Sequence, residues 1–183
     1  MDRPWLRRVR ALLAIGPLVA LSWAGAYAAF TDTVDATSSF STGSVAIEAD
    51  DQGGTVAFTS LSTSGMTPGT VVYAPLKISN AGTIGFDYAM GTATGGSAAL
   101  AAALTIGVKV VASTTCDASA YAGSGTVAVA EVAGLGNASM AARPLAVGVA
   151  EHLCFRVELP AGADNSLQGL TTDATFTFTA DPS

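Results

Sequence analysis

Two cysteines are the strongest candidates for a chemical role in this 183-residue chain. Cys116 and Cys154 could form a disulfide, hold a metal ion or provide a reactive thiol. A CxxC spacing is absent, and the one histidine, His152, cannot complete a zinc site with them. In an exported chain such a pair is most simply a disulfide. It would close a loop of about 39 residues and add roughly 4 kcal/mol of stability in the chain-entropy model.

The single histidine has no catalytic pattern around it. Zinc hydrolases generally use two or three nitrogen ligands, and H-E-x-x-H is absent. A Ser-His-acid triad would have to use His152 as well, and no G-x-S-x-G stands in the sequence. The glycine-rich run Gly91–Gly96 lacks the lysine that phosphate binding requires. We therefore predict no catalytic residue, no metal site and no cofactor, with His152 as an exposed strand residue.

Two weaker patterns, a possible calcium site and a possible glycosylation site, do not point to a catalytic activity. Asp50 and Asp51 could hold Ca²⁺ together with loop carbonyls, but no EF-hand spacing supports this, and solvated loop acids are favoured. Asn137-Ala138-Ser139 fits a glycosylation acceptor, a three-residue pattern that often occurs by chance.

The first residues are typical of an export signal. Four arginines precede Ala11–Ala26, a run of 16 residues without a charge. Ala26-Tyr27-Ala28 then places small residues where a signal peptidase reads, which predicts cleavage between Ala28 and Ala29. The alternative is a retained anchor, but a spanning helix needs about 20 apolar residues. We expect a signal peptide over residues 1–28, a secreted or cell-surface protein, and no stable membrane insertion after cleavage.

Cleavage changes the electrostatics of the chain. The whole sequence carries a net charge of −6, but four of its eight basic residues lie before the cleavage site. The mature chain keeps four basic residues against 13 acidic ones, a net charge of −9. Such a chain is repelled by phosphate backbones, so we expect no nucleic-acid partner.

The mature sequence alternates between apolar and polar residues, the pattern of β-strands. In Glu151–Leu159 the apolar face is Leu153, Phe155, Val157 and Leu159. That face should enter the core, and the other should meet solvent or a covering loop. Cys154 lies on the second face, so a bridge to Cys116 would pin a surface loop onto the outside of the sheet.

Seven further strands are predicted, separated by Gly, Pro, Asn and Asp turns. They are Gly43–Ala49, Thr55–Ser60, Val71–Ser79, Ile84–Met90, Leu104–Ala112, Thr126–Glu131 and Thr175–Ala180. Pro75 lies inside one of them, which predicts an edge strand or a bulge there.

This pattern predicts an all-β fold, a two-sheet antiparallel β-sandwich over residues 43–183. Ser97–Ala103, an alanine cluster, could form one short helix. Gly91–Gly96 and Ala118–Gly125 are interpreted as long mobile loops.

Ala29, Phe30, Thr31 and Asp32 stand directly after the predicted cleavage site, with Phe40 and Gly43 following. This stretch resembles the mature start of the TasA/camelysin family of exported bacterial proteins. A Pro-Gly turn and a strand ending in N-x-G correspond to Met66–Gly69 and Ile78–Thr83. Leu153–Pro160 and Asp164–Gly169 look like the late segments of the shorter members.

The resemblance implies a jelly-roll-like sandwich and cleavage by a dedicated signal peptidase of the SipW type. It also implies self-association into surface or biofilm-matrix fibres, in which the N-terminal segment of one subunit adds a strand to the next. Residues 29–42 would be that arm, carrying Phe30, Val34 and Phe40 into a neighbour's open sheet edge. The alternative is that these residues form the first strand of their own sandwich.

Camelysin-like members of the family are described as metallopeptidases, a chemistry for which this sequence offers only one histidine. The expected function is therefore an exported structural protein, a subunit of surface fibres or biofilm matrix. The alternatives are a secreted metalloendopeptidase and a monomeric cell-surface binding module.

Overall fold

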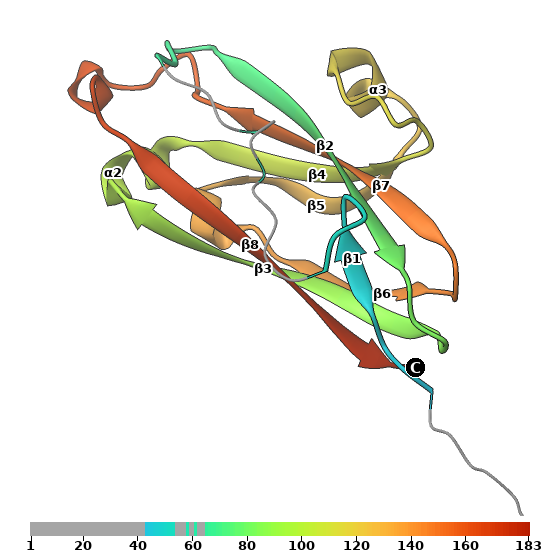
Figure 1. Ribbon diagram of the computed structural model, residues 1–183. Coiled ribbons are helices and arrows are strands. Elements are labelled where there is room, and N and C mark those ends of the chain that lie inside the picture. The colour runs from blue at the N-terminus through green and yellow to red at the C-terminus, as the bar shows by residue number, and fades with distance from the viewer. Residues whose placement is uncertain (1–42, 54–57, 59–60, 62–64) are drawn as a thin grey trace, which may run out of the picture. The chain divides into compact units, whose positions relative to one another are not determined.

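The computed structural model describes residues 43–53, 58, 61 and 65–183 (Figure 1). The predicted signal peptide, its cleavage residues Ala26, Ala28 and Ala29, and the predicted arm with Phe30, Val34 and Phe40 lie outside the described residues. Most of the predicted strand Thr55–Ser60 lies outside them as well.

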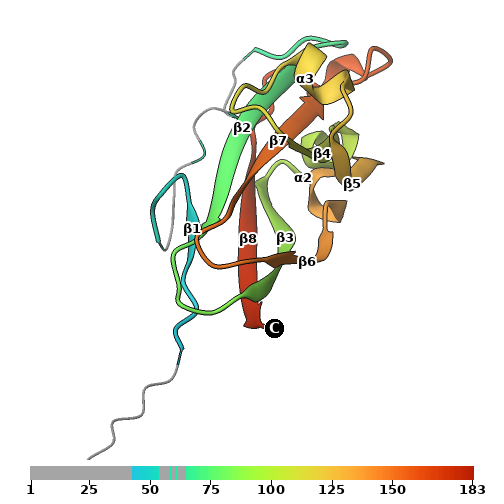
Figure 2. The ribbon, with the colours of Figure 1, turned by 90° about the vertical axis from the view of Figure 1, so that its right-hand side faces the viewer.

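The described residues form two antiparallel sheets, as the alternation predicts. In the five-stranded sheet the order is β1-β2-β7-β4-β5. Its strands are β1 (Ile47–Ala49), β2 (Val71–Asn80), β7 (Ala150–Glu158), β4 (Thr105–Val111) and β5 (Thr126–Ala133). The three-stranded sheet has the order β6-β3-β8, with β6 (Met140–Leu145), β3 (Phe86–Gly96) and β8 (Thr172–Pro182). The two sheets lie face to face, which confirms the all-β two-sheet sandwich (Figure 2).

One face of each sheet supplies the core. β7, between β2 and β4, buries Leu153, Phe155 and Val157, and Leu159 follows them into the core. These are the four residues that the alternation in Glu151–Leu159 assigns to the inner face. The three-stranded sheet packs its own buried residues against them. These are Phe86, Tyr88 and Met90 of β3 and Met140 and Leu145 of β6.

Short helices connect the strands. α2 (Ala98–Ala103) begins where predicted, because the hydroxyl of Ser97 accepts a hydrogen bond from the N–H of Leu100. α3 (Ala118–Ala122) occupies a segment predicted to be a long mobile loop, and that prediction is wrong. The carboxylate of Asp117 caps α3 by accepting a hydrogen bond from the N–H of Ala120. The alanine- and glycine-rich composition of the segment obscured this local capping signal.

Two 3₁₀ turns of the described chain, η2 (Leu135–Asn137) and η3 (Asn165–Leu167), form further connections. No helix in the described part of the chain is long and apolar enough to cross a membrane.

The second predicted loop, Gly91–Gly96, is also wrong. These residues continue β3, in register with β8 from Phe86 opposite Pro182 to Gly96 opposite Thr172. Glycine is a weak strand former when it is judged alone. Here the ladder with β8 supplies hydrogen bonds along the whole segment, so the tertiary partner decides its conformation.

Candidate functional site

On one side of the sandwich, no strand among the described residues bridges β2 and β8. A groove of about 700 Å³ lies there, and its lining is mostly apolar. Both sheets and the connecting segments contribute to it, among them Phe58, Leu61, Val72, Leu104, Val157 and Phe176. Phe58 is one of the lining residues, and its ring centroid lies 5.0 Å from that of Phe155 and 6.2 Å from that of Phe176. Leu61 N donates to the Phe58 carbonyl at 3.3 Å.

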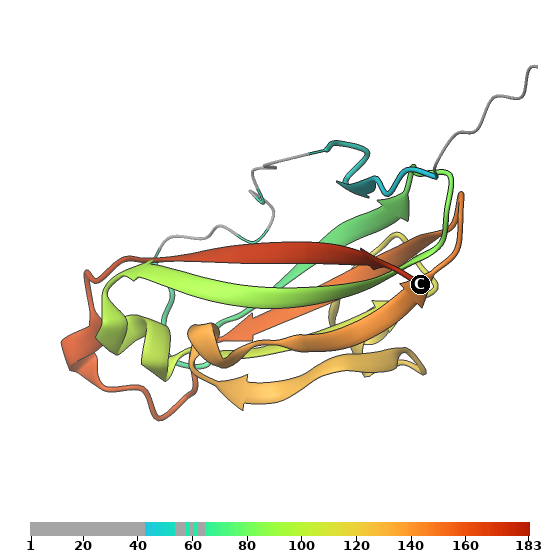
Figure 3. The same ribbon diagram turned by 90° about the horizontal axis from the view of Figure 1, so that it is seen from below.

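β8 is a long, regular edge strand (Figure 3). Its residues Thr172, Ala174 and Phe176 line one side of the groove. β8 pairs with β3 over 11 residues without a register shift, and its other side has no partner strand among the described residues. Two backbone hydrogen bonds flank the β3–β8 ladder: Ser97 N donates to Thr171 O, and Ser183 N donates to Gly85 O. They show that the odd-numbered residues of β8 form the hydrogen bonds to β3. Because alternate residues of an antiparallel strand bond to opposite sides, the even-numbered residues direct their N–H and C=O groups outward. These are Thr172, Ala174, Phe176, Phe178 and Ala180.

The other sheet edges carry features that discourage pairing with another chain. β6 is short, contains Pro144, and has a register irregularity against β3. The β4–β5 ladder has two such irregularities. β1 covers β2 only at Ile78–Asn80, and Pro75 lies in the remainder, where no described strand pairs with the outer side of β2. Pro75 therefore sits on an edge, as predicted. In comparison, β8 has no lysine, no arginine and no proline before Pro182.

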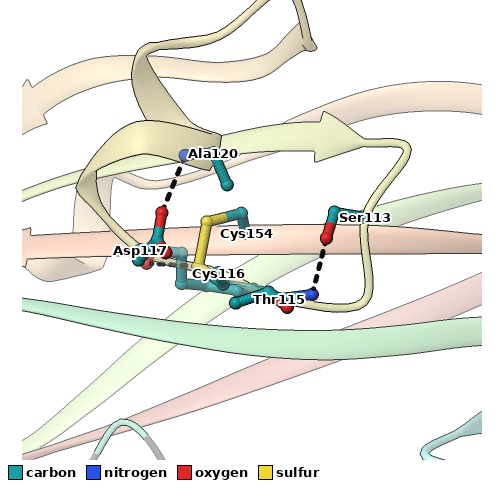
Figure 4. Close-up of a disulfide and its surroundings, with 7 residues drawn as sticks. Ser113, Thr115, Cys116, Asp117, Ala120 and Cys154 are labelled. Atoms are coloured by element: carbon teal, nitrogen blue, oxygen red, sulfur yellow. Dashed lines mark hydrogen bonds between the residues drawn. A yellow bond between two sulfur atoms is a disulfide. The ribbon is translucent and has the colours of Figure 1, made fainter.

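The predicted disulfide is present on the opposite, outer face of the five-stranded sheet. Cys116 and Cys154 are bonded, with a Cα–Cα distance of 5.2 Å (Figure 4). The bridge fastens the segment around α3 onto β7, as the sequence predicts. Cys154 is nevertheless fully buried, because Tyr121 and Val111 cover it in a small apolar cluster of their own.

A polar cluster surrounds this covered disulfide. Arg156 Nη2 donates to Glu158, and Arg156 Nη1 lies 3.1 Å from Glu131 Oε1 as an ion pair without hydrogen-bond alignment. Burial, with the charge of Glu131 adding to it, raises the pKa of Tyr121 to about 12. Lys109 Nζ lies 5.1 Å from the centre of the Tyr121 ring. These contacts tie α3 to β4, β5 and β7, so we interpret the cluster as structural.

A second ionic cluster joins the two sheets. Glu151 of β7 accepts a hydrogen bond from the hydroxyl of the buried Tyr88 of β3, and its Oε1 accepts from Arg143 Nη2 of β6 at 2.9 Å. Burial opposes ionisation of Glu151, but these two donors outweigh it and hold the pKa of its carboxyl below the usual value. Burial, followed by the hydrogen bond to Glu151, raises the pKa of Tyr88 far above its usual value. Local pattern does not reveal this cluster, because Tyr88 lies 63 residues before Glu151 and only the fold brings β3 and β6 of one sheet against β7 of the other.

The remaining residues singled out in the sequence lie apart from one another. His152 is on the outer face of β7, half-buried rather than exposed as predicted, because Lys77 and Val111 flank it on the neighbouring strands. Asp50 and Asp51 form a turn after β1, where Asp51 Oδ1 lies 2.6 Å from Lys77 Nζ. Asn137 is exposed in η2, and its side-chain amide donates to the Ala133 carbonyl. In the described residues, no three His, Cys, Asp or Glu side chains gather as metal ligands.

Fold and site together define a β-sandwich with a disulfide-fastened outer helix and an apolar groove beside β8, an edge strand whose outer side has no partner among the described strands. A scan against protein-family models found no match for this chain, and a search of curated proteins found none either. The resemblance to the TasA/camelysin family therefore stays a prediction.

Proposed function

We propose that this chain is an exported structural protein, a subunit of surface fibres or biofilm matrix that assembles by strand addition. The observation that carries the proposal is the open side of the sandwich. An apolar groove lies beside a regular sheet edge there, and strand addition needs both features. Backbone hydrogen bonds at the edge give affinity, and side chains entering the groove give specificity.

The donor in this proposal is the segment of residues 29–42 of a neighbouring subunit. Phe30, Val34 and Phe40 are all even-numbered, so in an extended chain their side chains point to the same face. Signal peptidase cleavage between Ala28 and Ala29 would release this arm from the membrane. N-terminal sequencing of the exported protein tests that step, and a start other than Ala29 would contradict it.

The assembly is tested on mature protein beginning at Ala29, held at high concentration and examined by negative-stain electron microscopy. We expect filaments from the unaltered protein and isolated particles from the variant F30D/F40D. A matched control, T31D/T33D, places the same two charges on the opposite face of the arm and should still form filaments.

Two results would contradict the proposal: isolated particles from the unaltered protein in all conditions, or filaments from F30D/F40D. Isolated particles would favour the second candidate, a monomeric cell-surface binding module that uses the same apolar groove for an external ligand. Chelator-sensitive proteolysis that is lost in His152→Ala would instead favour the metalloendopeptidase.

A further inference from the structure

We propose that β8 pairs with β8 of a second copy of this chain, which would join the two three-stranded sheets into one continuous sheet of six strands. The occupant of the edge is therefore a second copy. This contact does not need the N-terminal arm. It takes the β8 edge, so strand donation would then use the other edge beside the groove, the outer side of β2 before Ile78, in spite of Pro75.

The first argument is the backbone. Five residues of β8 direct both an N–H and a C=O group away from β3, and no described strand satisfies them. A long edge without a bulge, a lysine or an interior proline is a template for another strand. Two copies related by a two-fold axis present the same edge to each other in antiparallel orientation, so each outward donor meets an outward acceptor.

The second argument is the register. Centred on Phe176, the pairing places Thr172 opposite Ala180 and Ala174 opposite Phe178, so all five outward-facing residues find an outward-facing partner. Centred on Thr177, it would place Thr172 opposite Pro182, which has no N–H, and Asp173 opposite Asp181. Both registers pair the same number of outward backbone groups, because the C=O of Pro182 can still accept from Thr172. The first register is favoured because it avoids a pair of facing carboxylates.

The third argument is the side chains. In the register centred on Phe176, the large Phe178 faces the small Ala174 on the inner side. On the outer side Thr175 faces Thr177, and their neighbours on β3, Ala93 and Gly91, are small. The middle of the paired outer face is therefore uncharged, which matters because each mature copy carries a net charge of −9.

A charge-pair experiment tests both the contact and its register. In T175K/T177K each lysine would face a lysine of the other copy. In T175E/T177K the lysine at position 177 of each copy would face the glutamate at position 175 of the other. Both variants change the same two exposed threonines. We expect the dimer dissociation constant of T175K/T177K, from sedimentation equilibrium of mature protein, to exceed that of T175E/T177K by roughly tenfold or more. Equal constants with unchanged thermal transitions would overturn the proposal.

Cysteine cross-linking fixes the register independently. Thr175 and Thr177 would form a non-hydrogen-bonded pair, with Cα atoms about 4.5 Å apart, a distance a disulfide can span. A mixture of T175C and T177C proteins should yield a 175–177 cross-link on mild oxidation, identified by peptide mass spectrometry. A cross-link formed by T177C alone would place the axis on Thr177 and overturn the register, and no cross-link in the mixture would overturn the contact.

The arm could occupy this edge instead, and the variant F30D/F40D separates the two cases. If β8 pairs with β8, this variant loses filaments but keeps the dimer and its sensitivity to T175K/T177K. If the dimer disappears with the arm substitutions, the arm occupies the β8 edge and the proposed self-pairing is wrong. Failure of fibre assembly and failure of β8 pairing thus give different results.

Discussion

At the scale of single residues, Glu151 is the ionisable group that links the two sheets most directly. It accepts from Tyr88 on β3 and from Arg143 on β6 while its own strand belongs to the other sheet. Hydrogen bonds to a charged group contribute about 1.5–3 kcal/mol each, and removing one partner leaves the others unsatisfied. The ionised carboxylate therefore stabilises the closed sandwich.

The lowered pKa of Glu151 makes this stabilisation dependent on pH. Because its pKa is lower in the folded than in the unfolded state, the contribution is complete above the unfolded value, about 4.3, and is lost as the pH falls through the folded value. At pH 7 we expect Glu151→Gln to lower the free energy of unfolding by about 1–3 kcal/mol, measured by urea denaturation.

The same comparison at low pH is the control for that prediction. As the pH falls below about 4, wild-type Glu151 becomes protonated and its advantage over glutamine should shrink. A difference between the two proteins that stays constant from pH 7 to pH 3 would show that the charge of Glu151 is not the cause.

At the scale of elements, α3 is held on the outside of the five-stranded sheet by one covalent bond and few packing contacts. Only Tyr121 of this five-residue helix is buried. The disulfide from the adjacent Cys116 to Cys154 therefore does most to keep the helix in place.

We expect C116A/C154A to lower the free energy of unfolding by about 4 kcal/mol, because the 38-residue separation makes the loop closed by the bond long. Hydrogen exchange should also become faster in Ala118–Ala122 than in β4 or β7. The double substitution leaves no free thiol to form mixed disulfides. An unchanged denaturation midpoint would contradict the prediction.

Elements also show where local sequence signals fail. Alternation identified β2, β7 and β8, because each has one buried face and one exposed or covered face. It did not identify β6, which has a proline and two adjacent alanines in six residues. It ended β3 too early, since Gly91–Gly96 has no apolar face and is held in the strand by its pairing with β8.

At the scale of the whole molecule, net negative charge opposes self-association. The full sequence carries −6, and the predicted cleavage after Ala28 would leave −9. Either charge repels a second copy at neutral pH, and salt screens that repulsion. Raising the salt concentration from about 10 mM to 500 mM at pH 7 shortens the Debye length from about 30 Å to less than 5 Å. We therefore expect faster assembly at high salt, measured by light scattering and checked by electron microscopy.

Salt is a cleaner test of this prediction than acid. Acidification also reduces the charge, but it weakens the contact between Glu151 and Arg143 at the same time and could promote association by loosening the fold. Assembly that slows at high salt and pH 7 would mean that attraction between charges, rather than their repulsion, controls the contact.

The sequence by itself determined the class of fold, the inner face of β7 and the pairing of the two cysteines. These follow from alternation and from the number of cysteines, both of which can be read along a single chain. Only the tertiary structure decided that β8 lies beside an apolar groove with no described strand on its outer side, that Tyr121 buries Cys154, and that Glu151 joins the two sheets. The physical reason is the same in each case: these properties depend on which strands and helices become neighbours in space, and local sequence pattern does not specify that.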